Sequence, residues 1–143
     1  MVPPGLKSYD LVDNYPDTNH PCSSGYVNQC AIRMSIALEG AGVDLSGYTD
    51  NTCTHGHARG AQGLANFLKR QWGSPTWMYI KNKGKAKQLL LHHNGVIFFK
   101  NCFTREGETG RYGDHIDVWY DGSAMTYENF GGSDEVWFWK VLP

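Results

Sequence analysis

The amino-acid sequence predicts an α+β domain in which N-terminal helices pack on an antiparallel sheet. Apolar residues recur at helical spacing in two segments of the first half, residues 27–39 and 61–71. After residue 94, short apolar or alternating runs are separated by Gly-containing turns, which is typical of antiparallel strands. The chain has 143 residues, of which 41% are hydrophobic and 19% charged, and this suits one domain with its own core. Helices before strands is an order typical of α+β folds.

The first part of the chain is expected to contribute the helices. Residues 1–22 are rich in Pro, Asn and Asp and are expected to form an irregular lead-in. Residues 23–93 are expected to be mainly helical, with one long loop whose Gly, Thr, Asp, Asn and His residues show no period. The expected elements are a helix from about Val27 to Glu39, the loop over 43–60, a helix over 61–71, a short strand or extended link over 76–80, and a weaker helix over 85–92.

Residues 94–143 are expected to form the sheet. The near-continuous apolar run 96–100 is consistent with a buried central strand. A polar loop follows over 102–113, and then a strand from His115 to Tyr120. The dipeptide Asp121-Gly122 is a strong hairpin signal, so the chain is expected to return as a strand over 124–130. A last strand is expected over 135–142.

Charge and hydropathy exclude several classes of protein. The formal net charge of −1 provides no strong field to attract nucleic acid or an anionic membrane. No apolar run approaches the eighteen or so residues of a transmembrane helix, so no membrane insertion is expected. The N-terminal residues lack the basic-then-apolar layout of a secretory signal. We therefore expect a protein made in the cytoplasm and not exported by the general secretory route.

The strongest chemical signal is a cysteine at a helix start and a histidine on a later strand. Cys30 follows the polar residues Asn28 and Gln29 where the first helix is expected to begin. Exposed backbone N–H groups and the helix dipole at such a position favour the thiolate. His115 begins the expected strand after the polar loop. A histidine beside a thiol can take its proton and later protonate a leaving group, so the pair predicts a cysteine nucleophile with a histidine base.

A third group is needed to orient the imidazole, and the hairpin suggests where it lies. If Asp121-Gly122 is a two-residue loop, His115 lies opposite Glu128, and with a three-residue loop it lies opposite Asn129. Asp117 shares the face of His115 but lies two residues along the same strand, which makes it the weaker candidate. Glu128 is therefore the first choice for the third member, Asn129 the second, and Asp117 a further alternative.

The sequence around both residues resembles a known enzyme family. The two motifs are Gly25-x-x-Asn28-x-Cys30-Ala31-x-Arg33-x-Ser35 and Gly113-x-His115-Ile116-Asp117-Val118-Trp119, the latter followed by a turn and another strand. In this order and at this separation, they resemble the fourth class of type VI secretion amidase effectors. The resemblance covers most of the chain, from about Gly25 to the last strand. It implies a papain-like cysteine hydrolase related to the NlpC/P60 peptidases, with residues 1–143 forming a single amidase domain.

The resemblance also implies a substrate, partners and a place of action. Members of that family cut the bond between γ-D-glutamate and meso-diaminopimelate in peptidoglycan stem peptides. They are loaded onto the tube protein of the secretion apparatus and injected into the periplasm of a rival bacterium. A cognate immunity protein protects the producing cell. The enzymes use no metal or other cofactor, so none is expected here.

The resemblance also implies the site residues, because the two motifs match the family's motifs residue by residue. Cys30 matches the nucleophile and His115 the base. The family's third residue is an acidic group on the strand after the histidine, and here the spacing is shifted by a residue or two, which again selects Glu128. The backbone N–H of Cys30 is placed to hold the oxyanion. Gln29 and Asn28 are expected to support it.

The remaining cysteines and histidines allow other interpretations. With Cys30 as a free nucleophile, one disulfide among Cys22, Cys53 and Cys102 is possible, but spacing assigns no pairing. The segment Cys53-x-His55-x-His57 contains residue types that bind zinc, yet no second cluster lies at ligand spacing. We therefore expect the 50–60 loop either to border the substrate cleft or to be solvated, and not to bind a metal.

Two other classes of function are compatible with the composition. A non-catalytic cell-wall or carbohydrate-binding module would use the aromatic residues, which are 13% of the chain, and would not need Cys30. An intracellular papain-like thiol peptidase would cleave ordinary L-peptides. The paired motifs favour the peptidoglycan amidase over both.

Overall fold

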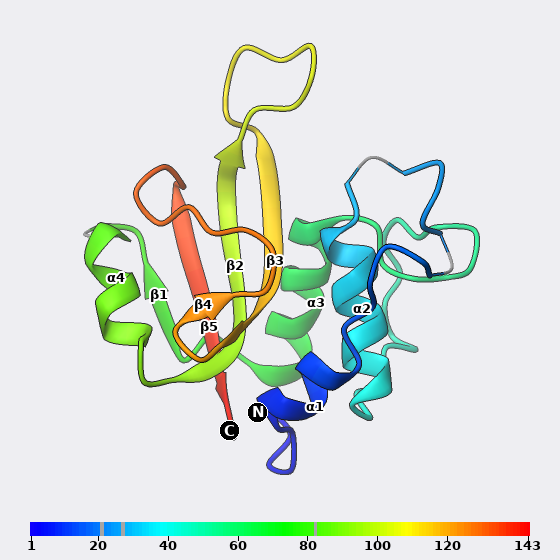
Figure 1. Ribbon diagram of the computed structural model, residues 1–143, viewed down its shortest axis with the longest axis horizontal. Helices are drawn as coiled ribbons and strands as arrows, with labels where there is room; N and C mark the ends of the chain where they lie inside the picture. Colours follow the sequence, from blue (N-terminus) through cyan, green and yellow to red (C-terminus); the bar gives the residue numbers. More distant parts are fainter. Residues whose placement is uncertain (21, 27, 82) are drawn as a thin grey trace.

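The computed structural model describes residues 1–20, 22–26, 28–81 and 83–143. Four helices and five strands are formed by these residues (Figure 1). The helices are α1 (Ser8–Asp13), α2 (Cys30–Gly40), α3 (Ala61–Trp72) and α4 (Lys83–Leu90). The strands are β1 (Trp77–Tyr79), β2 (Asn94–Phe103), β3 (Gly113–Tyr120), β4 (Ser123–Ala124) and β5 (Glu135–Val141).

The five strands form one antiparallel sheet in the order β1-β5-β2-β3-β4. Helices α1, α2 and α3 cover one face of this sheet, and α4 covers the other (Figure 1). Strand β2 lies at the centre, and its residues from Val96 to Phe99 are inaccessible to solvent. This explains its apolar run, because a strand covered on both faces has no solvent side that needs polar residues. The predicted α+β class, with helices on an antiparallel sheet, is confirmed.

Apolar side chains alternate between two cores, one on each face of the sheet. The first core packs Met34 and Leu38 of α2 against strand residues that include Ile116 and Val118. The second core lies under α4 and contains Trp119, which is fully buried. The Trp119 indole N–H donates a 2.8 Å hydrogen bond to the carbonyl of Leu90 at the end of α4. Burial of its ring and pairing of its polar atom together fix α4 against β3.

The helical part of the chain differs from the expectation at three places. Helix α4 spans Lys83–Leu90 and so lies two residues before the expected 85–92. The first helix begins at Cys30, three residues later than expected, and the expected start at Val27 lies outside the described residues. The lead-in contains α1, which the sequence did not predict because Lys7 at its start provides no side-chain cap. Tertiary contacts replace that local signal: Leu11 is fully buried, and the Ser8 N–H donates to Leu142 O at 2.8 Å.

The hairpin after β3 is shorter than expected. The two-residue turn Asp121-Gly122 is present, since Tyr120 pairs with Ser123 and Trp119 with Ala124. The return strand then ends at Ala124, although it was expected to continue to residue 130. Residues 125–130 leave the sheet, which changes the surroundings of His115.

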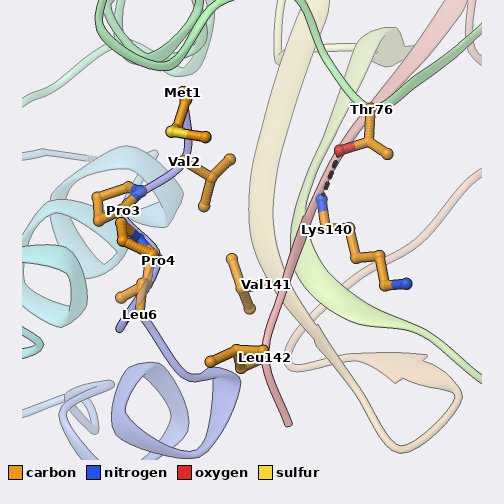
Figure 2. Close-up of a pocket in the computed structure, with 9 residues that line it drawn as sticks. All are labelled: Met1, Val2, Pro3, Pro4, Leu6, Thr76, Lys140, Val141 and Leu142. Carbon is orange, nitrogen blue, oxygen red and sulfur yellow. Dashed lines mark hydrogen bonds between the residues drawn. The ribbon is translucent and has the colours of Figure 1, made fainter.

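The N-terminal segment closes the end of the molecule away from the β2–β3 loop. It runs beside the end of β5, and an apolar hollow of about 390 Å³ lies between the two (Figure 2). Pro3, Pro4 and Val141 are among the residues lining it. Within the described residues, no helix is both long and apolar enough to cross a membrane.

Substitution of Gly95 tests how closely β2 and β5 pack at the centre of the sheet. A Cβ atom at this position would overlap the Trp139 carbonyl and lie 2.8 Å from the Phe138 ring. We expect Gly95→Ala to lower the free energy of unfolding by about 2–4 kcal/mol, because the backbone of β5 must move. Denaturant titration followed by fluorescence measures this change.

Gly84→Ala is the matched control. Gly84 lies in α4 and a Cβ atom there meets nothing within 4 Å. We expect this variant to be unchanged or more stable by up to about 1 kcal/mol, since alanine favours helix. Equal stability of the two variants would contradict the close packing inferred at Gly95.

Candidate active site

Cys30 is the first residue of α2 and lies beside β3. Its Sγ is 3.8 Å from the backbone carbonyl of Asp114, the residue that precedes His115. Helix α2 begins at the same end of the sheet as β3, so the start of a helix and the start of a strand meet there (Figure 1). The first-turn N–H groups of a helix lack intrahelical partners, so they are available to stabilise negative charge at this position.

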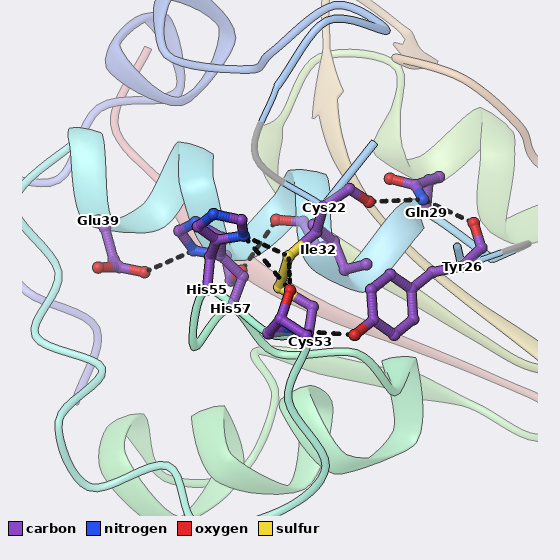
Figure 3. Close-up of a disulfide and its surroundings, with 10 residues drawn as sticks. Cys22, Tyr26, Gln29, Ile32, Glu39, Cys53, His55 and His57 are labelled. Atoms are coloured by element: carbon purple, nitrogen blue, oxygen red, sulfur yellow. Dashed lines mark hydrogen bonds and ion pairs between the residues drawn. A yellow bond between two sulfur atoms is a disulfide. The ribbon is translucent and has the colours of Figure 1, made fainter. Parts of the chain in front are cut away.

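The turn before Cys30 is held by a disulfide and by a side chain. Cys22 is bonded to Cys53, at a sequence separation of 31 and with 6.2 Å between their Cα atoms (Figure 3). A closed loop of this length stabilises the fold by roughly 3–4 kcal/mol in the chain-entropy description. The Gln29 side chain donates hydrogen bonds to Cys22 O at 3.1 Å and to Tyr26 O at 2.7 Å.

These contacts change the expected role of Gln29. Both donors of its amide group are used by backbone carbonyls of the preceding turn, so the Gln29 amide does not point its donors toward an oxyanion, as had been expected. It braces the turn that presents Cys30. Asn28 is exposed and lines the same hollow as Cys30, so its support of an oxyanion stays a prediction.

The alternative zinc interpretation of the 53–57 segment is contradicted by the disulfide. Cys53 is bonded to Cys22 and has no thiolate to offer a metal. His57 lies beside Glu39, with Nδ1 3.4 Å from Oε1, and His55 Nδ1 is 3.4 Å from Cys22 Sγ. Across the described ranges, no three His, Cys, Asp or Glu side chains are grouped so that they could hold a metal ion.

His115 is buried between Cys30 and Asp117. Its Nε2 lies 2.8 Å from Asp117 Oδ2, the geometry of a hydrogen bond from the ring to the carboxylate. Since Nε2 is used in this way, Nδ1 is the ring nitrogen left to face the thiol of Cys30. Asp117 therefore fixes the orientation of the ring and leaves Nδ1 as the ring nitrogen outside this contact.

Asp117 is fully buried and its carboxylate is surrounded by donors. Oδ1 accepts from the Val118 N–H at 2.8 Å. Oδ2 accepts from His115, from the N–H and hydroxyl of Thr126 at 2.9 and 2.8 Å, and from the Tyr127 N–H at 3.3 Å. These donors satisfy both oxygens of the buried carboxylate.

The charge of this site favours the protonated imidazole. Burial lowers the pKa of His115, but hydrogen bonds to Asp117 and Cys30 and the negative charge of both groups outweigh it and raise the pKa to about 9. At neutral pH the ring is therefore mainly an imidazolium. A thiol that gives its proton to such a ring becomes a thiolate beside a positive charge, which is the reactive form of a nucleophilic cysteine.

The structure does not place Glu128 beside His115 and thus corrects the first choice for the third member. Glu128 forms an ion pair with Lys87 of α4. Asn129, the second choice, donates to Cys102 O at 2.8 Å. Both expectations assumed that the return strand stays in the ladder, whereas residues 126 and 127 turn inward to bind the buried carboxylate of Asp117.

Two residues at the site were not predicted as functional. Thr126 bridges Asp117 and His115, since its hydroxyl donates to the Asp117 carboxylate and lies 3.3 Å from His115 Nε2. The Tyr15 hydroxyl is buried nearby, and its pKa is raised mainly by burial and also by the charge of Asp117. Arg33, one of the motif residues, lies over the Tyr15 ring at 4.8 Å and donates to Pro16 O. The lead-in thus forms one wall of the site, which no local pattern in the sequence indicated.

A polar hollow of about 240 Å³ opens beside the thiol. It is lined by Cys30 and Asn28, by the end of the 43–60 loop, by the first turn of α3, and by Arg105 and Asp114. Asn28 also lines two adjoining hollows, one toward Tyr26 and one toward Phe103. The three hollows therefore meet at Asn28, two residues before Cys30.

Comparison with known proteins assigns the family. The family model "type VI secretion system (T6SS), amidase effector protein 4" (Tae4) matches residues 26–139. The chain belongs to this family. Members are peptidoglycan amidases that work as cysteine hydrolases, so the chain is an amidase effector with DL-endopeptidase activity on peptidoglycan, as the two motifs predicted. No curated protein sequence matches it.

Solved structures of Tae4 proteins share the fold. The Tae4 effector of Salmonella typhimurium, in complex with the immunity protein Tai4 of Enterobacter cloacae, matches with a TM-score of 0.66 and 16% identity over 96% of this chain and 99% of that chain. The Tae4–Tai4 complex of Enterobacter cloacae matches with a TM-score of 0.57 and 17% identity over 80% and 74%. These likenesses confirm the papain-like, NlpC/P60-type fold predicted for this Tae4 chain.

Asp117→Asn tests the orienting carboxylate. Because the carboxylate raises the pKa of His115, we expect the alkaline limb of the kcat/KM profile to move from about pH 9 toward lower pH. At neutral pH, kcat/KM should fall by roughly 10²-fold or more, since an amide does not hold the imidazolium equally well. Rates of stem-peptide cleavage from acidic to alkaline pH measure both effects.

Glu128→Gln is the control for this experiment. It removes the carboxylate that the hairpin register favoured, and it breaks only the contact with Lys87. We expect its pH profile to match that of the unmodified enzyme. A shifted limb in Glu128→Gln, with none in Asp117→Asn, would reverse the assignment.

Alkylation measures the reactivity of the thiols. Cys30 is half-buried beside His115, whereas Cys102 is buried and its pKa is raised, mainly by burial, to about 12. We expect iodoacetamide at neutral pH to modify Cys30 at least about tenfold faster than Cys102, with Cys22 and Cys53 unmodified because they are bonded. Peptide mass mapping reports each site, and comparable rates at Cys30 and Cys102 would contradict an activated thiolate.

Proposed function

We propose that Cys30, His115 and Asp117 form the catalytic triad that cleaves the bond between γ-D-glutamate and meso-diaminopimelate. The observation that supports this assignment is the continuous chain of contacts from a thiol at a helix start, through a buried imidazole, to a carboxylate with several donors. A nucleophile, a base and an orienting group in this order are what cysteine hydrolysis requires.

The first half of the reaction forms an acyl-enzyme. The Cys30 thiolate attacks the γ-glutamyl carbonyl carbon, and the carbonyl oxygen becomes an oxyanion beside the free N–H groups at the start of α2. His115 then gives its proton to the diaminopimelate nitrogen, the C–N bond breaks, and the amine leaves. The product on the enzyme is a thioester between Cys30 and the γ-carboxyl of D-glutamate.

The second half restores the enzyme. His115, now neutral, takes a proton from water, and the resulting hydroxide attacks the thioester carbonyl. The C–S bond breaks, and the D-glutamyl product leaves with a new γ-carboxyl group that gives its proton to solvent. Cys30 and His115 thereby return to the thiolate–imidazolium pair. Throughout, Asp117 keeps Nδ1 directed at the reacting atoms.

The biological setting is also a proposal. We infer delivery by the type VI tube protein into the periplasm of a rival cell, where the stem peptide is the substrate. The Cys22–Cys53 disulfide supports an oxidising place of action. The related Salmonella and Enterobacter Tae4 proteins are seen with Tai4 immunity proteins, so a cognate immunity protein is proposed here as well.

Digestion of purified peptidoglycan tests the proposed reaction. We expect fragments with a new free amine on diaminopimelate and a free γ-carboxylate on D-glutamate, identified by mass spectrometry. Cys30→Ala should produce none, because the thiolate that attacks the carbonyl is gone. The Asp121→Asn variant is a folded control, since asparagine accepts the positive φ of 54° at that turn.

The same digestion separates the alternatives. A binding module would leave the wall fragments unchanged and would bind equally well with Cys30→Ala. A general thiol peptidase would cleave L-peptides at least as fast as γ-D-glutamyl peptides. Either result would contradict the proposed triad function.

A further inference from the structure

The hollow beside Cys30 carries charges of both signs that do not neutralise one another. Arg59 and Asp50 both line it, yet they form no ion pair with each other. Arg59 has an aromatic neighbour, its guanidinium carbon lying 5.5 Å from the centre of the Tyr26 ring, and within the described part of the chain no acidic side chain pairs with it. A stacked guanidinium keeps its planar donors free for a carboxylate.

The carboxylate of Asp50 lies at the hollow, against the first turn of α3. A Cβ atom at Gly63 would lie 2.5 Å from Asp50 Oδ2, so a larger residue there would displace the carboxylate from this position. Its Oδ1 accepts the N–H of the next residue, Asn51, at 2.8 Å, and Oδ2 has no cation beside it among the described side chains. Asp114 and Arg105 also line the hollow and add a second pair of unlike charges.

Arg59 is the better carboxylate ligand of the two arginines. Arg105 already has a carboxylate neighbour, with 3.7 Å between its Nη1 and Glu108 Oε1. Asp114 Oδ1 accepts the Asn101 N–H at 2.8 Å, so that carboxylate is also partly used within the protein. Arg59 and Asp50 therefore remain as the groups whose charges are available to a ligand.

A ligand that can pair with both Arg59 and Asp50 carries a carboxylate and an ammonium group, which can share one carbon. The stem peptide proposed above has one such group, the distal amino-acid centre of diaminopimelate. The α-carboxylate of D-glutamate has no ammonium group on the same carbon, because its nitrogen is part of an amide bond. The Asp50 carboxylate would therefore repel it. The distal centre lies about five single bonds of ~1.5 Å from the scissile nitrogen, or roughly 6 Å when extended, so it reaches a hollow that Cys30 itself lines.

We propose that Arg59 binds the distal carboxylate of diaminopimelate and Asp50 its distal ammonium, so that this wall selects the residue after the cleaved bond. The inference rests on the proposed function. It adds the residues that determine specificity. Charge-assisted hydrogen bonds at a partly exposed wall are modest, so we expect discrimination of about tenfold for each charge and not a complete exclusion.

Four tetrapeptides of the form L-Ala-γ-D-Glu-X-D-Ala test the proposal. X is meso-diaminopimelate, L-lysine, diaminopimelate amidated at the distal carboxylate, or diaminopimelate acetylated at the distal amine. Initial rates give kcat/KM for each. We expect the unmodified enzyme to prefer the first peptide about tenfold or more over each of the other three.

Two variants test the charges of Arg59 and Asp50 one at a time. Arg59→Gln should bring the lysine and amidated peptides to within about threefold of the diaminopimelate peptide, with discrimination against the acetylated peptide retained. Asp50→Asn should reduce discrimination against the acetylated peptide alone. Arg70→Gln, on the last turn of α3 and outside this hollow, and Asp121→Asn are the charge-matched controls and should keep every ratio.

The outcomes separate this inference from the triad proposal. Equal cleavage of all four peptides by the unmodified enzyme would overturn the inference and leave the reaction in place. Variants that lower all four rates in parallel would also overturn it, because the residues would then act on structure alone. Failure of the folded enzyme to cleave any peptide would overturn the proposed function, and this inference with it.

Discussion

The active site depends on one buried charge, the carboxylate of Asp117. An unpaired carboxylate in this position would be strongly destabilising, so the surrounding chain must provide donors. It does so from three directions: the ring of His115, the backbone of β3 itself, and the segment after β4. Satisfying the carboxylate therefore orients the imidazole and also decides where the sheet ends.

The end of β4 follows from this requirement. After a two-residue turn, β4 would continue to pair along β3 if ladder hydrogen bonds alone determined its length. Here the N–H groups of Thr126 and Tyr127 bind Asp117 in place of ladder partners. Cys30, the first residue of α2, lies beside this part of β3, with its Sγ 3.8 Å from Asp114 O. The short β4 and the orientation of the His115 ring thus both depend on the Asp117 carboxylate.

The loop between α2 and α3 links stability to the substrate cleft. Its disulfide anchors it to the turn before Cys30, and it supplies Asp50 and Arg59 to the hollow beside the thiol. Glycine at position 63 lets the carboxylate approach the start of α3. This loop has no regular structure, but the disulfide at Cys53 and the contact of Asp50 with the start of α3 position it. A long loop can in this way contribute defined groups to a site.

The sequence by itself determined the α+β class, α3 to within a residue, the central strand, the hairpin turn, and the cysteine and histidine that the structure brings together. These depend on local periodicity, turn chemistry and short motifs, which a linear chain displays directly. Only the tertiary structure decided the position of α1, the Cys22–Cys53 pairing, and the hydrogen bonds of Gln29 to the turn before Cys30. It also decided that His115 contacts Asp117, while Glu128 pairs with Lys87. Each of these depends on which distant groups meet in the folded chain. A buried carboxylate recruits its partners through space, so the register of a hairpin could not reveal them.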